Sequence, residues 1–186
     1  MPAPSKLFES AFRELIDTLE SQPFPYCLLG GLALGLWAAP RATQDLDILA
    51  AVREQQRSQL IGALEGKGFE FDRQWAEDNP MIRTWHLRFR RGMIPVDLLL
   101  PRDVHDREVL ERRRRLKLHE LSLWVITPED LVLHKLKAGR PRDFEDAVSV
   151  LVRQKTSLDL AYLNNWAQRL GITEELGYCL DQSTEP

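Results

Sequence analysis

Two hydrophobic periods alternate along this chain. In the first segment apolar residues recur three or four positions apart, which predicts an amphipathic helix with Ser5 as its cap. Shorter apolar runs bounded by glycine and proline predict strands, and Trp85, Leu87 and Phe89 alternate with polar residues. Helices are predicted over residues 5–21, 32–39, 54–66, 128–138, 142–153 and 158–171. Strands are predicted over residues 26–29, 45–52, 69–75 and 84–90, with one more after Gly92.

The order of these elements predicts an α/β (α+β) protein. Strands and helices mix over the first part of the chain, and they would form a mixed β-sheet of about four or five strands flanked by helices. After Thr127 only helices follow, and Thr127-Pro128 supplies a capping hydroxyl and a proline at the first helical position. We therefore expect a catalytic core over residues 1–125 and a C-terminal helical part over residues 126–186.

The composition is that of a globular protein, since 44% of the 186 residues are hydrophobic and 28% are charged. No apolar run has the length of a membrane span, and the N-terminus lacks the basic segment followed by an apolar segment that is typical of a signal peptide. Cys27 and Cys179 are too few for a disulfide framework or a zinc pattern, so we expect a reducing cytoplasm. The net charge of −3 gives no prediction of nucleic-acid binding.

One local excess of charge is the run of four arginines at residues 112–115. Such a run is an ordinary feature of a solvated helix end. It could also contact the phosphates of a large acceptor such as tRNA, because guanidinium groups bind phosphate bidentately. No aromatic residue interrupts the run, so it does not predict stacking on unpaired bases.

Three aspartates carry the candidate chemistry. Asp45 and Asp47 lie two residues apart in a predicted strand, so both side chains project from the same face. Asp97 interrupts another apolar run, where a buried carboxylate needs a compensating partner. Carboxylates on one face are tolerable when Mg²⁺ lies between them, and this ion also binds substrate phosphates. The three aspartates therefore predict a phosphate-handling site, in which two metal ions would suit nucleotidyl transfer.

The pair Gly30-Gly31 precedes the helix that leads to these aspartates. Residues without a Cβ let a phosphate approach backbone N–H groups at the start of a helix. Taken alone, such a pair is more often a tight turn or a packing contact. Its conjunction with the aspartates favours a phosphate site, where Arg41 and Thr43 would add a cation and a hydroxyl that orient the carboxylates.

These motifs together resemble the signature of the DNA polymerase beta-like nucleotidyltransferase superfamily. The likeness is strongest to its minimal bacterial branch, which includes the AbiEii-type toxins and the lincosamide and aminoglycoside nucleotidyltransferases. In the AbiEii-like proteins a lysine, then an arginine–aspartate pair, follow the catalytic strands. The segments that carry the resemblance are Gly30-Gly31 and residues 41–48, 96–98, 127–136 and 142–146.

The resemblance implies a nucleotidyltransferase fold and transfer of a nucleoside monophosphate from an NTP such as ATP to a hydroxyl, with release of pyrophosphate. It implies that Asp45, Asp47 and Asp97 are catalytic and bind two Mg²⁺ ions. The residues implied to contact the NTP are Gly30, Gly31, Arg41, Thr43, Lys135, Arg142 and Asp143. The acceptor stays open among tRNA, a small molecule and a protein. A toxin role beside a cognate antitoxin is also implied.

Other interpretations stay open at this point. Many relatives carry Gly-Ser where this chain has Gly30-Gly31, which leaves a catalytically inactive nucleotide-binding or regulatory module of the same fold as the alternative. Lys135 could instead be a surface charge whose aliphatic stem covers apolar neighbours. Arg142-Asp143 could be an ordinary helix start. The histidines lack metal-ligand spacing and are expected at the surface or in packing; they are His86, His105, His119 and His134.

Overall fold

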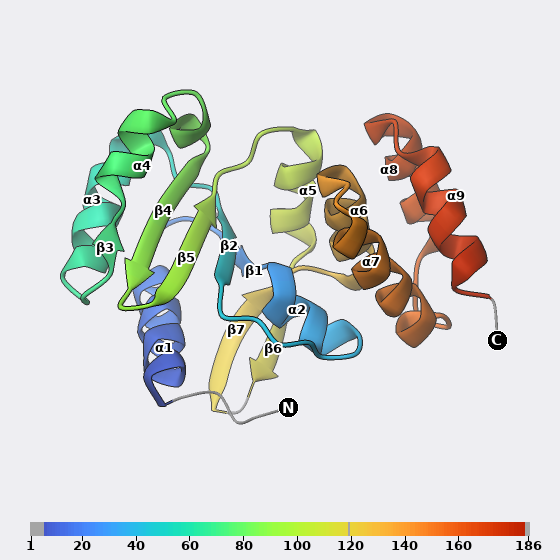
Figure 1. Cartoon of the computed structure of the whole chain (residues 1–186), viewed down its shortest axis with the longest axis horizontal. Helices are drawn as coiled ribbons and strands as arrows, with labels where there is room; N and C mark the ends of the chain where they lie inside the picture. Colours follow the sequence, from blue (N-terminus) through green and yellow to red (C-terminus); the bar gives the residue numbers. More distant parts are fainter. Residues whose placement is uncertain (1–5, 119, 185–186) are drawn as a thin grey trace.

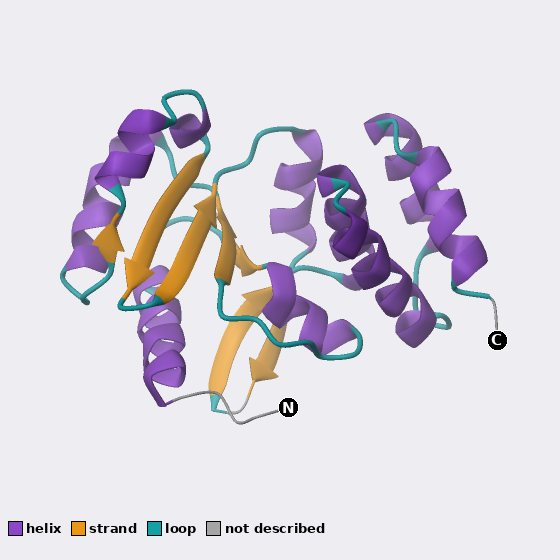
Figure 2. Cartoon of the chain, in the orientation of Figure 1, coloured by secondary structure: helices purple, strands orange, loops and turns teal. Residues whose placement is uncertain are grey.

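The computed structural model describes residues 6–118 and 120–184, so Ser5 and His119 lie outside the described part. At its centre these residues form a seven-stranded mixed sheet in the order β3-β4-β5-β2-β1-β7-β6. Figure 2 shows the strands and the helices that surround them. The strands are β1 (Tyr26–Leu28), β2 (Leu46–Ala50), β3 (Glu70–Phe71), β4 (His86–Arg91), β5 (Ile94–Leu99), β6 (Arg114–Leu118) and β7 (Leu121–Val125).

The helices divide into two groups on either side of this sheet. Helices α1, α3 and α4 lie near β3 and β4, and α6 to α9 gather at the opposite side of the molecule, beyond α2 and α5 (Figure 1). A short 3-10 turn, Ile82–Thr84, precedes β4. The α-helices are α1 (Lys6–Glu20), α2 (Gly30–Trp37), α3 (Glu54–Glu65), α4 (Arg73–Asp78), α5 (Val104–Arg112), α6 (Pro128–Ala138), α7 (Pro141–Gln154), α8 (Leu160–Leu170) and α9 (Thr173–Gln182).

The middle of the sheet positions the polar residues of interest. Strand β2 runs parallel to β5 and antiparallel to β1. Leu46 and Ile48 of β2 are fully buried, as the alternation of a strand requires for one face, and Asp47 projects from the other face. The polar positions of β2 and β5 therefore lie together on one face of the sheet.

The predicted α/β class is confirmed, and most predicted helices and strands are present to within a few residues. The Thr127 hydroxyl accepts from the backbone N–H of Asp130 and begins α6, and Gly139 ends it in the left-handed conformation with φ of 67°. Cys27 and Cys179 are both buried and free. In the described part of the chain, no helix has the length and apolar character that a bilayer crossing requires.

Three parts of the prediction were wrong. The run 69–75 forms only the two-residue strand β3, because the Asp72 side chain accepts from the backbone N–H of Trp75 and starts α4. The sheet has two more strands than the upper end of the expected range, since β6 and β7 form an antiparallel hairpin. This hairpin joins the sheet where Leu28 of β1 pairs with Val125, a long-range contact that no local pattern reports. Helices α5 and α9 were also missed.

The C-terminal helices are tied to the core through Trp37 at the end of α2. Its indole N–H donates to the Ile126 carbonyl at 2.8 Å, and its own carbonyl accepts from the Gln154 side chain at 2.7 Å. Strand β7 ends at Val125 and α6 begins at Pro128. We keep the division at residues 125/126 as a proposal about chain organisation.

Candidate active site

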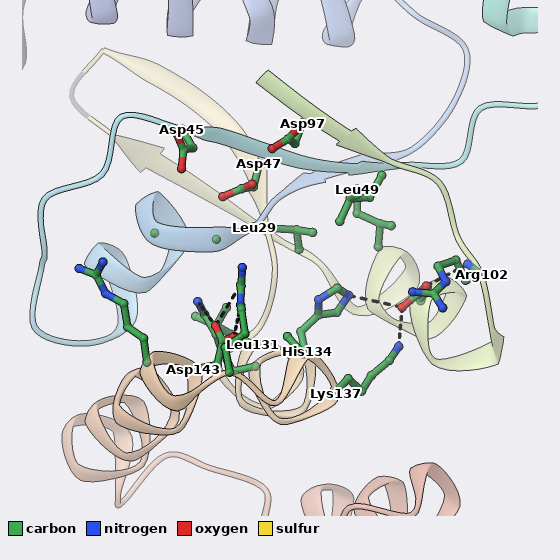
Figure 3. Close-up of a pocket in the computed structure, with 18 of the residues that line it drawn as sticks. Leu29, Asp45, Asp47, Leu49, Asp97, Arg102, Leu131, His134, Lys137 and Asp143 are labelled. Atoms are coloured by element: carbon green, nitrogen blue, oxygen red, sulfur yellow. Dashed lines mark hydrogen bonds and ion pairs between the residues drawn. The ribbon is translucent and has the colours of Figure 1, made fainter. Parts of the chain in front are cut away.

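Three carboxylates lie on one side of a cavity of about 730 Å³. Asp47 and Asp97 are neighbours across parallel strands, because they are partners in the register of β2 and β5. Asp45 precedes β2 by one residue and lies two positions from Asp47, so it projects from the same face. Figure 3 shows the three side chains together on the sheet side of the cavity. The structure thus brings the three predicted acids to one place.

Gly30 and Gly31 make room for this cluster because neither has a Cβ. Gly30 has φ of +62°, and a Cβ added there would lie 1.8 Å from Asp47 Oδ2. A Cβ on Gly31 would lie 2.8 Å from the Cβ of Thr43. Helix α2 therefore begins directly against Asp47, and a serine at position 31 would require Thr43 to move.

The Asp47 carboxyl group is buried among like charges. Burial raises its pKa to about 6, and the negative charges of Asp97 and Asp45 act in the same direction. Within the described residues, the side chains of Asp45 and Asp47 have no hydrogen bond or ion pair. A carboxylate pair left without a bonded cation is the arrangement that a hard divalent ion would stabilise.

The opposite wall of the cavity carries cations from α6 and α7. Lys135 Nζ lies 3.0 Å from Asp143 Oδ1 and 2.7 Å from Asp146 Oδ2. Arg41 binds Asp146 through two hydrogen bonds of 3.1 Å. Arg140 in turn binds Asp143, with Nε 2.6 Å from Oδ2. One network thus joins the loop before β2 to both helices.

This network holds an excess of one positive charge against the cavity, because three cations share two carboxylates. Burial opposes the ionisation of Asp143, but hydrogen bonds from Arg140 and Lys135 outweigh it and lower the pKa of that group. The Lys135 ammonium uses two of its three N–H donors on the aspartates and keeps the third. Arg142 also lines the cavity and has no ion-pair partner among the described residues.

His86, which the sequence interpretation left outside the site, contacts the third aspartate. Its Nε2 lies 2.8 Å from Asp97 Oδ1, and Arg88 Nε lies 3.6 Å from the same oxygen. The alternation in β4 already places His86 and Arg88 on the face opposite Leu87. What the sequence did not provide was the register of β4 on β5, which brings this face beside Asp97.

A second group of polar side chains lies at the far end of the cavity. Asp103, His105 and Asp106 have potential metal-ligand atoms within 4.8 Å of one another. Lys137 Nζ already lies 2.8 Å from Asp103 Oδ2 and 2.7 Å from Asp106 Oδ1. Figure 3 shows Lys137 directed at these carboxylates. Because Lys137 pairs with both acids, this group is an ion-pair cluster of the fold.

The arginine run makes contacts within the molecule. Arg112 lies over the ring of Tyr162, 3.7 Å from its centroid. Arg113 and Arg115 lie over Trp124 at 4.5 Å and 5.3 Å. Cation–π contacts of this kind stabilise the fold. Three of the four arginines thus pack on aromatic rings. Because α5 ends at Arg112 and β6 begins at Arg114, the run as a whole is not the solvated helix end that was expected, and contact with acceptor phosphates stays a prediction.

The family model described as "Nucleotidyltransferase of unknown function (DUF6036)" matches residues 6–175. No curated protein matches the sequence significantly.

Solved structures share the fold over most of the chain. An antigenic nucleotidyltransferase-like protein from Paracoccidioides brasiliensis has 19% identity and a TM-score of 0.54, with 97% of this chain and 95% of that one covered. ANT(2'')-Ia in complex with adenylyl-2''-tobramycin has 12% identity and a TM-score of 0.57, over 90% and 98%. The lincomycin-bound lincosamide adenylyltransferase LnuA has 16% identity and a TM-score of 0.53, over 76% and 95%. At these identities the likeness concerns the fold.

Proposed function

The chain belongs to the DUF6036 family of nucleotidyltransferases, and we propose that it transfers a nucleoside monophosphate from an NTP to an acceptor hydroxyl, with release of pyrophosphate. The observation that carries the proposal is the register pairing of Asp47 with Asp97, with Asp45 on the same face. Three converging carboxylates suit nucleotidyl transfer, because this reaction depends on positioning and charge neutralisation. The inactive module is disfavoured, since all three acids are present and face one cavity.

The same carboxylates fit Mg²⁺, which we propose as the metal, with two ions in the working enzyme. The fit rests on the Asp47 side chain, which is buried, has a raised pKa and lacks a bonded cation among the described residues. Asp45, Asp47 and Asp97 would be the ligands. When bound, the metal would neutralise the triphosphate and make the acceptor hydroxyl easier to deprotonate.

The remaining cavity residues have roles that follow from their positions. Gly30 and Gly31 would let the triphosphate approach the backbone N–H groups at the start of α2. Lys135 would donate its third N–H to a phosphate oxygen, and Arg142 would add a second charge. The acceptor oxygen then attacks the α-phosphorus in line, and the bond from this phosphorus to the pyrophosphate oxygen breaks.

Arg41, Thr43 and Asp143 belong to the same proposal in supporting positions. Arg41 and Asp143 are members of the charge network, so they would hold Lys135 at the cavity wall. Thr43 Oγ1 accepts from the backbone N–H of Asp45 at 3.4 Å and would fix the segment that enters β2. These residues would orient the groups that contact the NTP.

The acceptor in this proposal is a hydroxyl compound, and the only indications of its chemical class come from similar proteins. ANT(2'')-Ia was solved with adenylyl-2''-tobramycin and LnuA with lincomycin, so a small molecule is one candidate beside tRNA and protein. A toxin role with a cognate antitoxin stays a prediction from the resemblance. Growth of cells that express the chain with and without its neighbouring reading frame tests it, and harmlessness in both states would count against a toxin.

The function is tested by incubating the protein with each α-labelled NTP, Mg²⁺ and a cell extract, and by measuring pyrophosphate release. Label in one acceptor class is the expected result. The double variant Asp45→Asn with Asp47→Asn should abolish transfer and keep the fold. Asp17→Asn, at an exposed position of α1, is the matched control and should transfer normally. Retained transfer in the double variant would overturn the proposal.

A further inference from the structure

His86 is enclosed by aromatic neighbours. Its ring lies 4.8 Å from the ring of Trp75 at 62° and 5.8 Å from that of Trp85 at 26°. Arg88 lies over Trp75, and Arg102 lies over Trp85 with its guanidinium 4.3 Å from the ring centroid. The histidine side chain is only 16% exposed. A ring packed in this way has little freedom to turn, so its Nε2 points in one fixed direction.

That direction leads to Asp97. In the antiparallel register of β4 and β5, Arg88 lies directly opposite Asp97 and His86 is the diagonal neighbour, within reach of a long side chain. The distance from His86 Nε2 to Asp97 Oδ1 is 2.8 Å, whereas Arg88 Nε is 3.6 Å away and its guanidinium lies over Trp75. The histidine is therefore the closer hydrogen-bond partner of this carboxylate.

The contact engages only one oxygen of Asp97. Over the described residues no hydrogen bond or ion pair reaches Oδ2. The register partner of Asp97 is Asp47, which lies on the cavity side of the sheet. A carboxylate fixed at Oδ1 cannot rotate freely, so its second oxygen keeps a constant position relative to the other two acids.

We propose that His86 is a positioning residue that donates from Nε2 to Asp97 Oδ1 and thereby holds Oδ2 for the site shared with Asp45 and Asp47. The proposal rests on the proposed function, in which Asp97 is one of the metal ligands. Partners that orient a ligating carboxylate are worth about 10- to 100-fold in metal affinity or activity. His86 then acts through Asp97 and has no contact of its own with the substrate.

Two variants separate hydrogen-bond donation from ring packing. His86→Phe keeps a flat ring between the tryptophans and removes the donor, whereas His86→Gln keeps an N–H at a similar reach. We expect His86→Phe to weaken Mn²⁺ binding, measured without nucleotide by electron paramagnetic resonance, by about tenfold or more. It should lower kcat by a similar factor and leave the KM for the NTP unchanged. His86→Gln should recover most of both losses.

Arg88→Gln is the matched control, because it alters the other neighbour of Asp97 and leaves the histidine bond in place. Its effect on Mn²⁺ affinity should be smaller than that of His86→Phe. A folded His86→Phe protein with unchanged Mn²⁺ affinity and kcat would overturn the proposal. A larger loss in Arg88→Gln, or no recovery in His86→Gln, would do the same.

A measurement on the unmodified protein keeps the proposal testable if His86→Phe fails to fold. Long-range ¹H–¹⁵N spectra report which ring nitrogen carries hydrogen, and we expect hydrogen on Nε2 of His86. A ring with hydrogen on Nδ1 alone cannot donate to Asp97 and would overturn the inference. Asp97→Asn distinguishes this failure from that of the proposed function. If Asp97→Asn binds Mn²⁺ and transfers normally, Asp97 is not a ligand and the inference about His86 falls, while nucleotidyl transfer itself stands. If the unmodified protein transfers nothing, the proposed function falls.

Discussion

Gly30 lies so close to Asp47 that a Cβ on the glycine would be 1.8 Å from Oδ2 of the aspartate. Any side chain at position 30 would therefore occupy the space of the carboxylate. The same glycine has a positive φ of 62°, which L-residues with a Cβ rarely adopt. Backbone conformation and contact with the acid thus require glycine for separate reasons.

These two reasons can be separated with Gly30→Ala. Strain at positive φ alone costs about 1–2 kcal/mol. Gly92→Ala is the matched control, because Gly92 has φ of 58° and open space around its missing Cβ. We expect Gly30→Ala to lower the free energy of unfolding in urea by more than the control does and to abolish transfer. An equal decrease in the free energy of unfolding in the two variants would mean that the contact with Asp47 does not affect stability.

The second glycine of the pair is limited by Thr43. Gly31→Ser should be destabilising because its Cβ would lie 2.8 Å from the Cβ of Thr43. Removing the whole threonine side chain, including its Cβ, should relieve that contact, so Thr43→Gly combined with Gly31→Ser should be more stable than the sum of the single effects by about 1 kcal/mol. Urea unfolding of the four proteins measures this coupling. Strict additivity would contradict the contact.

Asp47 predicts a dependence of stability on pH in the metal-free protein. The pKa of the Asp47 carboxyl group is about 6 in the folded protein, compared with an ordinary value of 3.8. The folded state therefore binds the proton more tightly than the unfolded state does. Stability contributed by this group is therefore lost as pH rises from about 4 to 6, by about 3 kcal/mol in total. Asp47→Asn, which carries no charge, should be more stable than the parent by that amount above pH 6 and equal to it below pH 4.

Urea unfolding across this pH range, with a chelator present, measures the difference. Adding Mg²⁺ at pH 7.5 should raise the unfolding temperature of the parent and not that of Asp47→Asn, since only the parent keeps the full set of ligands. A difference between the two proteins that does not change with pH would contradict the assignment of the raised pKa to Asp47.

The charge network predicts a large effect at Asp146. Asp146→Asn removes the charged partner of Arg41 and one of the two charged partners of Lys135, and Lys135 is only 6% exposed. Loss of one member of a buried ion pair costs about 3–5 kcal/mol. The exposed pair of Arg90 with Glu70 is the control, and Glu70→Gln should cost less than about 1 kcal/mol. Chemical denaturation compares them, and similar losses would show that burial of the network has no consequence.

The sequence predicts the parts of this protein that are determined locally. Period-two and period-3.6 patterns and the Thr127 cap give the fold class and most elements, and the spacing of Asp45 and Asp47 places both on one face. What it could not provide depends on strand register. The β6–β7 hairpin joins the sheet through a pairing of Leu28 with Val125, which are far apart in the chain, and the bond from His86 to Asp97 depends on the exact register of β4 on β5.

Charged residues are the second reason why the sequence prediction differs from the structure. The start of β6 could not be predicted from the four consecutive arginines. An arginine side chain can equally extend into solvent or pack over an aromatic ring such as that of Trp124, so the residue type alone does not indicate its surroundings. The alternative interpretation of Lys135 as a surface charge was wrong, since the residue is buried against aspartate partners that lie eight and eleven residues further along the chain. Such pairings become visible only when α6 and α7 are placed against each other.

Trp37 binds the C-terminal part of the chain through two groups of its own. Its indole N–H donates to Ile126, and its backbone carbonyl accepts from Gln154. Truncation near residue 125 would strip away both anchors together with the partners of Arg41, so a shortened chain would carry unmatched polar groups at its new surface. We therefore expect the two segments to form a single cooperative unit, in which heat or denaturant unfolds the strands and the terminal helices in one transition.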